Sequence, residues 1–272
     1  MTPSRRAFLL GGIGAAGLAL AGCGLPDGVP DNGPGPMVSD TFHSSYRHQD
    51  VGYAISYPPG HKPGEQLPVL VTLHGRGGDH TTAFHRSLYL DHYQAQAVQQ
   101  GVRAFVVTAV DGGDHEYWHP RDDGDPAGMV EHEFIPLLGR HGLQVDRVAL
   151  LGWSMGGYGA LYLASRMGAG KVCAMVAESP AIWHHSRQSV EGAFDDAADW
   201  HDATIWHQQQ ALRGIAVRID CGADDGFAPV TRDLRASLHP TPAGGIEPGG
   251  HDSSYWRTQA PAQFRWLARH FT

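Results

Sequence analysis

Cysteine is scarce in this chain, which has three among 272 residues, at positions 23, 173 and 221. So few cysteines exclude a small disulfide-stapled scaffold. Cys173 is expected near the start of one buried strand and Cys221 at the end of another. If those strands are parallel neighbours, the two residues lie ~20 Å apart, whereas a disulfide bridges ~4.4–6.8 Å between Cα atoms. We therefore expect Cys173 and Cys221 to be free, mostly buried thiols.

A strongly basic segment is also missing. Lysine occurs only at positions 62 and 171, the formal net charge is −8, and no run of basic residues occurs. This acidic balance argues against nucleic acid or other anionic polymers as partners. With 42% hydrophobic residues, the composition is that of a globular protein.

No apolar run reaches the ~20 residues that a membrane-spanning helix needs. The longest, Ala7 to Ala21, has about 15 residues and follows Ser4-Arg5-Arg6-Ala7-Phe8-Leu9, which resembles a twin-arginine export signal. It ends in Leu20-Ala21-Gly22-Cys23, which resembles a bacterial lipobox. We expect residues 1–22 to be the signal, Cys23 to be lipidated, and the protein to be exported and membrane-anchored through this lipid only. A simple cleaved signal or an uncleaved anchor remains an alternative.

The remaining chain is predicted to contain a tether and one domain. Half of residues 24–39 are Gly or Pro, so we expect residues 23–40 to form an extended tether. Residues 41–272, roughly 230 in number, suffice for one α/β domain. The expected strands are 51–57, 67–73, 103–109, 147–152, 172–177 and 215–221, and the expected helices are 83–100, 128–140, 155–167, 229–238 and 260–270.

This alternation predicts a mainly parallel, doubly wound sheet with helices on both faces. Ligands then bind at the carboxyl ends of the strands. Residues 181–212 form a longer insertion between two strands and contain Trp183, Trp200 and Trp206. The insertion is expected either to cover the sheet or to cap a pocket.

The sequence Gly152-Trp153-Ser154-Met155-Gly156 fits G-x-S-x-G, between a strand-like run and an Ala-rich helix. In that context the serine lies on a sharp turn with its Oγ held clear of the sheet. Residues two before and two after the serine nearly touch, which requires small side chains, and both are glycine here. Ser154 is therefore the candidate nucleophile.

A nucleophilic serine needs a base and an orienting acid, which follow in the order Ser, Asp, His on a sheet of this kind. The strand-like run ending at Asp220 leads into a loop with two candidate acids, Asp224 and Asp225. His251 follows on a glycine turn before the last helix. Ser154, His251 and one of the two aspartates form the expected catalytic set.

A glycine-rich loop, His74-Gly75-Arg76-Gly77-Gly78, directly follows the strand-like run 67–73. A loop of this kind can point backbone N–H groups at a developing oxyanion without obstruction by side chains. The expected donors are the N–H groups of Arg76 and Met155, the residue after the nucleophile.

One competing motif points to a different enzyme class. Residues 115–119, His-Glu-Tyr-Trp-His, fit the H-E-x-x-H pattern of zinc proteases. That chemistry requires a helix, yet Asp111-Gly112-Gly113 precedes the motif and Pro120 disfavours helical angles before it. We therefore expect a loop that walls the substrate pocket, and no metal site.

From about Tyr46 onward, the chain resembles the α/β-hydrolases that include esterase D (S-formylglutathione hydrolase), feruloyl and acetylxylan esterases, and the secreted mycolyltransferases. The matching segments are His74-Gly75, Asp111-Gly112-Gly113 with Tyr117-Trp118, Gly152 to Gly157, Gly222 to Phe227, and Gly250-His251-Asp252. In this family the acid usually stands two places before the aromatic residue, which selects Asp225. The mycolyltransferases generally use a glutamate instead.

The resemblance implies an α/β-hydrolase fold and a serine carboxylic-ester hydrolase that forms an acyl-enzyme and needs no cofactor. The expected partner is a small-molecule, glycan or lipid ester, and the candidate substrate-binding residues are Tyr117, Trp118, Trp153 and Trp183. An acyltransferase of the mycolyltransferase type and a non-catalytic, esterase-like surface lipoprotein remain alternatives.

Overall fold

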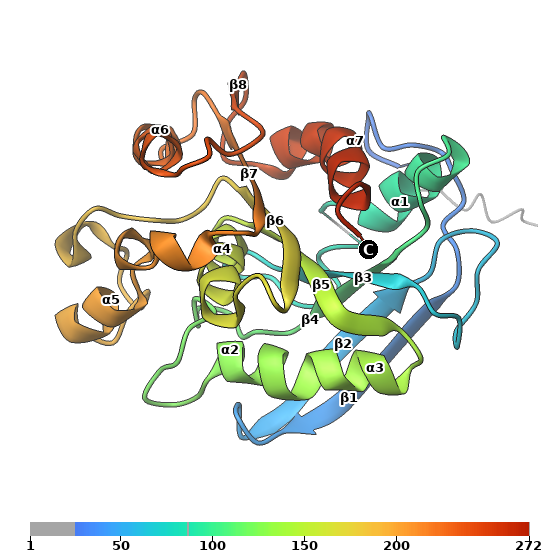
Figure 1. Cartoon of the computed structure of the whole chain (residues 1–272), viewed down its shortest axis with the longest axis horizontal. Helices are drawn as coiled ribbons and strands as arrows, with labels where there is room; N and C mark the ends of the chain where they lie inside the picture. Colours follow the sequence, from blue (N-terminus) through green and yellow to red (C-terminus); the bar gives the residue numbers. More distant parts are fainter. Residues whose placement is uncertain (1–24, 86, 272) are drawn as a thin grey trace, which may run out of the picture.

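A computed structural model describes residues 25–85 and 87–271. In this part of the chain, the strands form one eight-stranded sheet in the order β1-β2-β4-β3-β5-β6-β7-β8 (Figure 1). β1, β2 and β4 pair antiparallel, and the pairs from β4 to β8 are parallel. The mainly parallel sheet predicted from the sequence is confirmed.

The strands are β1 (Met37–Ser44), β2 (Gln49–Ser56), β3 (Pro68–Leu73), β4 (Val106–Val110), β5 (Gln144–Trp153), β6 (Val172–Glu178), β7 (Ala216–Gly222) and β8 (Ile246–Glu247). The α-helices are α1 (Leu90–Gln99), α2 (Pro126–Met129), α3 (Ile135–Arg140), α4 (Met155–Met167), α5 (Ala197–Ala203), α6 (Ala228–Ser237) and α7 (Ser253–Ala268). A π-helical segment, Val130–Phe134, joins α2 to α3.

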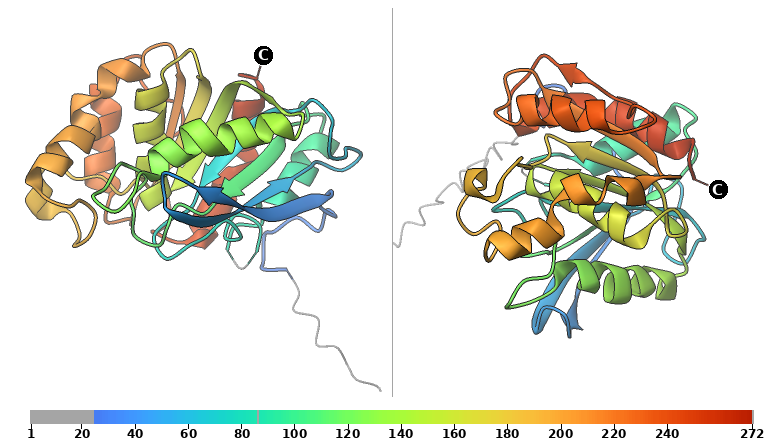
Figure 2. Two further views of the ribbon diagram at one scale, coloured as in Figure 1. Left: turned by 90° about the horizontal axis from the view of Figure 1, so that it is seen from below. Right: turned by 60° about the vertical axis from the view of Figure 1, so that its left-hand side comes forward.

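Helices cover both faces of the sheet, and each face has its own apolar core. Along β3, Val69 and Val71 face the core that α2, α3, α4 and α6 complete, whereas Leu70 faces the core under α1 and α7. Successive strand residues point to opposite faces, and both faces are buried, so the central strands are apolar throughout. Figure 2 shows helices on either side of the sheet.

The predicted tether is wrong at its carboxyl end. Residues 37–40 form the first half of β1, which pairs with β2 over its whole length. β1 is an edge strand with several exposed residues, so it lacks the apolar pattern that predicts a buried strand. Residues 25–36 also contact the domain, because the Gly28 and Pro30 carbonyls accept hydrogen bonds of 3.0 Å from Tyr93 and His92. The predicted signal and Cys23 lie outside the described residues.

Two helices begin elsewhere than predicted. α1 begins at Leu90 rather than at residue 83, because Tyr89 is left-handed (φ 53°) and turns occupy most of the residues before it. α7 begins at Ser253 rather than at residue 260, because Asp252 caps it by accepting a 3.0 Å hydrogen bond from the Tyr255 N–H. The capping residue Asp252 is the local signal that marks the start of α7, whereas no side chain caps the start of α1.

The insertion between β6 and β7 contains α5 and three short 3₁₀ turns, Ser186–Gln188, Ile205–His207 and Gln209–Leu212. It is attached to the sheet layer by hydrogen bonds, since Tyr158 of α4 donates to the Ala203 carbonyl (2.8 Å). It also holds itself together, since Trp206 Nε1 donates to the Trp183 carbonyl (2.9 Å). In Figure 1 the insertion lies at the left end of the molecule, beyond α4.

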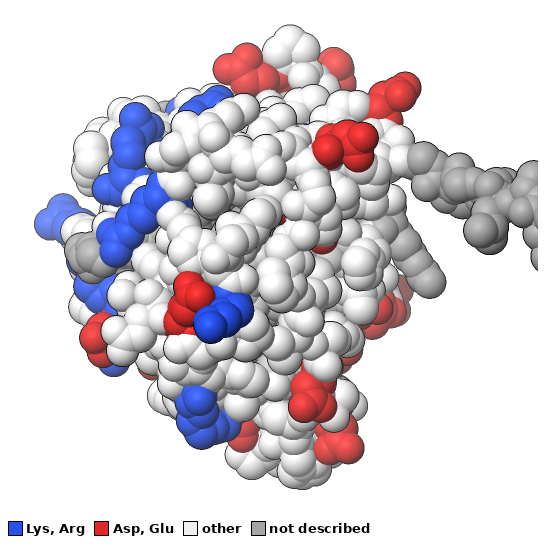
Figure 3. Space-filling model, turned by 90° about the vertical axis from the view of Figure 1, so that its right-hand side faces the viewer, with Lys and Arg blue, Asp and Glu red and all other residues white. Residues whose placement is uncertain are grey.

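Charged side chains are unevenly distributed over the surface. On the face drawn in Figure 3, Lys and Arg gather mainly toward the left, and Asp and Glu mainly toward the right and top. A broad uncharged area separates them. The acidic excess of the sequence is therefore not spread evenly over this face.

Candidate active site

Ser154 stands on the sharp turn between β5 and α4. Its backbone (φ 56°, ψ −120°) is a strained conformation for a residue other than glycine. A Cβ at Gly152 would collide with the Gly156 carbonyl, and one at Gly156 would collide with the Leu73 carbonyl. The turn therefore tolerates only glycine at both positions, as the motif predicts.

The structure brings Ser154, His251 and Asp225 together. His251 Nε2 lies 2.8 Å from Ser154 Oγ, and His251 Nδ1 lies 2.8 Å from Asp225 Oδ2. Ser154 is half-buried and His251 is exposed, so the pair is open to solvent. A serine hydroxyl beside an imidazole that a carboxylate holds on its other side is the arrangement of nucleophilic catalysis.

Two loops converge to place the acid and the histidine. The Asp224 N–H donates to the Gly249 carbonyl (2.9 Å), which joins the loop after β7 to the turn before His251. A side chain at Gly222 would collide with that same carbonyl, so glycine permits the close approach. Asp225 is 4% exposed and faces His251, whereas Asp224 is exposed. Of the two candidate acids, Asp225 is the one in contact with His251.

The Asp225 carboxylate is held in its charged form. Burial by itself raises its pKa, but the hydrogen bonds from His251 and the Phe227 N–H outweigh burial, so the pKa lies below its ordinary value. The Phe227 N–H donates to Oδ1 at 2.8 Å, which leaves Oδ2 for His251. The carboxylate is thus charged and fixed in orientation.

The glycine-rich loop after β3 lies at the same edge of the sheet, because Leu73 pairs with Gly152 of β5. His74 is buried; its Nε2 accepts from the Gly112 N–H (3.0 Å), so its Nδ1–H donates to the Gly75 carbonyl (2.9 Å). A Cβ at Gly75 would press on Trp153. The loop is therefore packed against the turn that holds Ser154, with Arg76 exposed and Met155 buried at the start of α4.

The four predicted substrate-binding aromatics differ in position. Trp118 is fully buried, and its Nε1 donates to the His74 carbonyl (3.1 Å). The prediction that Trp118 lines the pocket is wrong, because Gly112 and Gly159 leave room for its ring in the core. Tyr117 and Trp153 are 3% and 2% exposed, while Trp183 is half-buried and lies 5.8 Å from the Tyr117 ring.

A hollow of about 290 Å³ lies between the start of the insertion and the start of α6. Its apolar lining includes Trp183 and Phe227, and its polar lining consists of His184, Gln188 and Asp233. Phe227 also packs 5.4 Å from the His251 ring and 5.6 Å from Trp183. Phe227 therefore lies between the hollow and His251, and none of the three candidate catalytic residues lines the hollow itself.

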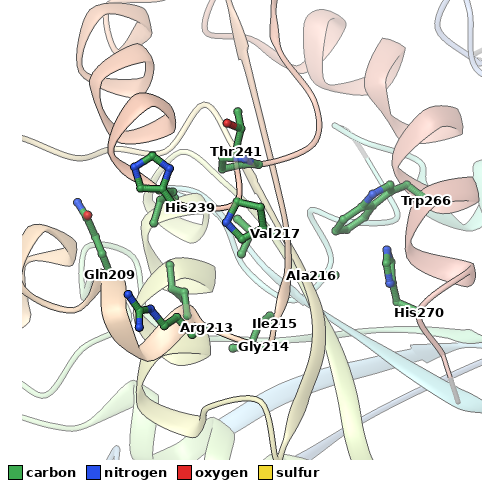
Figure 4. Close-up of a pocket in the computed structure, with 14 residues that line it drawn as sticks. Gln209, Arg213, Gly214, Ile215, Ala216, Val217, His239, Thr241, Trp266 and His270 are labelled. Atoms are coloured by element: carbon green, nitrogen blue, oxygen red, sulfur yellow. The ribbon is translucent and has the colours of Figure 1, made fainter.

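A separate hollow of about 220 Å³ lies at the other end of β7 (Figure 4). Arg213, Trp266 and His270 line it, and no predicted site residue does. Since Asp225 follows the carboxyl end of β7, this hollow is not part of the candidate site.

The H-E-x-x-H segment does not form a helix. His115 is exposed beside Asp114, whereas His119 is buried with its two ring nitrogens 3.0 Å from the Pro120 and Ala193 carbonyls. Within residues 25–85 and 87–271, no three His, Cys, Asp or Glu side chains gather as metal ligands. The two histidines therefore lack the shared helix face that a zinc protease needs.

Cys173 and Cys221 are free and buried, as expected. The sequence reasoning missed two residues beside the site, Ser179 and Trp256. Ser179 follows β6 at the edge that carries Ser154, and Trp256 lies in the first turn of α7, five residues after His251. The position of Ser179 after a buried strand was the available signal.

The fold and this side-chain geometry define a serine hydrolase of the α/β-hydrolase class. Residues 44–267 match the family described as "Putative esterase", and the chain belongs to that family. It is accordingly a serine esterase by class. Comparison with curated proteins gives no match.

Solved structures of low sequence identity share the fold. A ferulic acid esterase is 21% identical with a TM-score of 0.75, over 89% of this chain and 100% of that one. An S-formylglutathione hydrolase from Agrobacterium tumefaciens is 18% identical with a TM-score of 0.71, over 88% and 96%. The fluorophosphonate-binding serine hydrolase F of Staphylococcus aureus is 17% identical with a TM-score of 0.70, over 87% and 99%.

Proposed function

We propose that this chain hydrolyses carboxylic esters with Ser154 as nucleophile, His251 as general base and Asp225 as orienting acid. The observation that supports it is the pair of 2.8 Å distances joining His251 to Ser154 and to Asp225. As Ser154 Oγ bonds to the acyl carbon, its proton passes to His251 Nε2, and Asp225 stabilises the imidazolium that forms. The carbonyl oxygen becomes negative, and the N–H groups of Arg76 and Met155 donate to it.

The tetrahedral intermediate collapses when the bond from the acyl carbon to the alcohol oxygen breaks. His251 returns its proton to that oxygen, and the alcohol leaves an acyl group on Ser154. A water molecule then attacks the acyl carbon, gives a proton to His251, and releases the carboxylic acid as Ser154 regains its proton. His251 takes and returns every proton that moves, so the proposed cycle needs no cofactor.

The substrate proposed is a small-molecule, glycan or lipid ester with an apolar part. Phe227 contacts His251 on one side and Trp183 on the other, and these two aromatic rings form an apolar part of the neighbouring hollow that suits an apolar group. One structure with this fold is a ferulic acid esterase, and another, a feruloyl esterase module, is complexed with sinapinate. An ester panel from acetyl to long acyl chains, with feruloyl and acetyl-sugar esters, identifies the preferred class.

The decisive test replaces the nucleophile. Ser154→Ala is expected to abolish hydrolysis of short p-nitrophenyl esters, because alanine offers no oxygen to attack the carbonyl. Circular dichroism and the Tm are expected to match the wild type. The matched control is Ser56→Ala on β2, which removes a buried serine hydroxyl that donates to Gln94 of α1. Activity retained by Ser154→Ala would overturn the assignment.

Three assays distinguish the proposed esterase from a non-catalytic lipoprotein, a metallohydrolase and an acyltransferase. A fluorophosphonate probe is expected to label the wild type and not Ser154→Ala, because the probe reacts with an activated serine; a non-catalytic lipoprotein would not be labelled. Dialysis against a chelator is expected to leave the activity unchanged, whereas a metallohydrolase would lose it. Transfer of the acyl group to an added alcohol in preference to water would favour the acyltransferase.

For its location, the protein is proposed to be exported and anchored to the membrane through a lipid on Cys23. The support is the sequence pattern of residues 4–23. Among the described residues, no helix has the length and apolar character to cross a membrane.

A further inference from the structure

His251 stands on a turn that gives its side chain little support. It lies between the pair Gly249-Gly250 and the first residue of α7, Ser253, and its side chain is 32% exposed. The side chain can rotate about two bonds, yet the proposed reaction needs one orientation of the ring, in which Nε2 reaches Ser154 while Nδ1 reaches Asp225. An exposed side chain keeps to one orientation only where neighbouring groups hold it there.

Two aromatic rings contact the imidazole. The Phe227 ring centroid lies 5.4 Å from that of His251, with the planes at 54°, and the Trp256 centroid lies 5.2 Å away, with the planes at 85°. Aromatic rings attract each other at these separations, and the nearly perpendicular contact of Trp256 is a geometry that such pairs prefer. Phe227 comes from the loop after β7 and Trp256 from the first turn of α7, so two separate elements hold the ring.

Trp256 is itself fixed to the sheet. Its Nε1 donates to Ser179 Oγ (3.1 Å). Ser179 is fully buried directly after β6, and its N–H donates to the Asp220 carbonyl of β7 (2.8 Å). The indole ring also packs against the apolar core under α1 and α7. It cannot turn without breaking these contacts, so its orientation is defined relative to the strands that carry the site.

The two aromatic neighbours differ in what else they contact. Phe227 lines the hollow of about 290 Å³ between the insertion and α6, whereas Trp256 does not. A substitution of Phe227 would therefore alter the hollow as well as the contact with His251. A substitution of Trp256 leaves the lining of the hollow intact, so its effect on the reaction reports on the position of His251.

We propose that Trp256 is a positioning residue for the reaction, and that its anchored indole ring sets the plane of the His251 imidazole. In that plane, one ring nitrogen faces Ser154 and the other faces Asp225. This inference rests on the proposed esterase function. Without the indole, the imidazole samples orientations in which one of these hydrogen bonds is lost, so a smaller fraction of the molecules is ready for proton transfer.

The test compares Trp256→Leu with Trp266→Leu, a closely matched control. Trp266 lies near the other end of the same helix, packs against the same core and meets the ring of a histidine, His270, at 4.6 Å. Trp256→Leu is expected to lower kcat roughly 10-fold, the effect of losing one aromatic contact, with KM unchanged. Trp266→Leu is expected to keep the kcat and KM of the wild type.

Further variants separate positioning from folding. Both leucine variants are expected to lower the Tm, because both remove apolar side-chain volume from one core. Trp256→Phe keeps an aromatic ring without the indole donor and is expected to lose less kcat than Trp256→Leu. If Trp256→Leu does not fold, Trp256→Met takes its place, because a flexible apolar chain fills an irregular gap better, and the same loss of kcat is expected.

Proton NMR gives a readout that a purely structural role would not change. The His251 Nδ1–H that is hydrogen-bonded to Asp225 is expected to give a signal far downfield of the amide protons. The variant His251→Ala lacks this proton and thereby assigns the signal. In Trp256→Leu the signal is expected to broaden or disappear, because a proton that leaves its hydrogen bond exchanges with water. In Trp266→Leu it is expected to remain.

Three results would overturn the inference: a wild-type kcat in the leucine or methionine variant of Trp256, a loss confined to KM, or a lowered kcat beside an unchanged Nδ1–H signal, since the imidazole would then be in place. Failure of the proposed function looks different. In that case the wild type itself neither hydrolyses esters nor reacts with a fluorophosphonate probe.

Discussion

At the scale of single residues, two adjacent aspartates differ because the chain turns between them. Asp225 is buried and its carboxylate is hydrogen-bonded to the Phe227 N–H and to His251, while Asp224 is exposed and its backbone N–H donates to the Gly249 carbonyl. Replacing the Asp225 carboxylate by an amide removes the negative charge that holds the Nδ1–H tautomer of His251. The same replacement at Asp224 changes only a side chain that is exposed to water.

Asp225→Asn is therefore expected to lower turnover by a factor on the order of 10⁴, by analogy with other enzymes that lose an orienting acid. Asp224→Asn, the matched neighbour, is expected to cost far less. Steady-state kinetics on a p-nitrophenyl ester measures both. If the two losses were exchanged, Asp224 would be the orienting acid.

At the scale of elements, the carboxyl ends of β6 and β7 place two carboxyl groups side by side. Glu178 and Asp220 are register partners, and Gln263 of α7 donates to both, at 3.1 and 3.0 Å. Arg218 pairs with Asp220 at 2.7 Å. Burial first, and the Asp220 charge second, raise the pKa of Glu178 well above its ordinary value, which favours the neutral form of its carboxyl.

This arrangement predicts a pH-dependent stability with a definite sign. A group whose pKa is raised in the folded state contributes stability below its unfolded pKa, near 4.5, and loses it as the pH rises toward the folded value. Glu178→Gln removes this loss. Its Tm is expected to exceed that of the wild type at pH 8, by ~2–4 °C for each kcal/mol added to the free energy of unfolding. Near pH 4 the two Tm values are expected to match.

Glu133→Gln is the matched control with the opposite sign. Burial alone would raise the pKa of Glu133, but hydrogen bonds from Ser44 and Ser45 outweigh burial and lower it. That variant is expected to lose stability at pH 8 and to approach the wild type near pH 4. Thermal unfolding at both pH values checks the pair, and Glu178→Gln less stable than the wild type at pH 8 would contradict the argument.

At the scale of the whole molecule, the segment after residue 24 is packed on the domain. Gly28 and Pro30 accept hydrogen bonds from α1, and β1 begins at Met37. A lipid on Cys23 would therefore hold the domain close to the membrane rather than at the end of a long flexible tether.

Cys23→Ser is expected to release the protein from the membrane fraction into the soluble exported fraction, because serine cannot form the thioether to a diacylglycerol. Fractionation of expressing cells and a blot of each fraction measure this. Cys173→Ser replaces a buried cysteine of the domain and is expected to remain membrane-bound. A Cys23→Ser protein that stayed with the membrane would refute the lipid anchor.

Much of the fold was predictable from local patterns. The strands from β2 to β7 and the helices α4 and α6 lie within a few residues of their predicted ranges, because buried parallel strands are short apolar runs and their helices begin and end at recognisable residues. The sequence did not predict β1, because an exposed edge strand has no such pattern. The predicted start of α1 is too early, because the left-handed backbone of Tyr89 cannot be read from the neighbouring residues.

The sequence by itself determined that Ser154 stands on a strand-to-helix turn. The turn has room only for glycine two residues before and two residues after the serine, and both glycines can be read from the five-residue motif. Only the tertiary structure decided which aspartate faces His251, that Trp118 lies in the core, and that Trp256 meets Ser179, 77 positions away. The physical reason is the distance along the sequence between the residues that determine each feature. Backbone turns and periodic burial depend on adjacent residues, whereas the direction of a carboxylate or an indole depends on loops that come together only when the sheet is assembled.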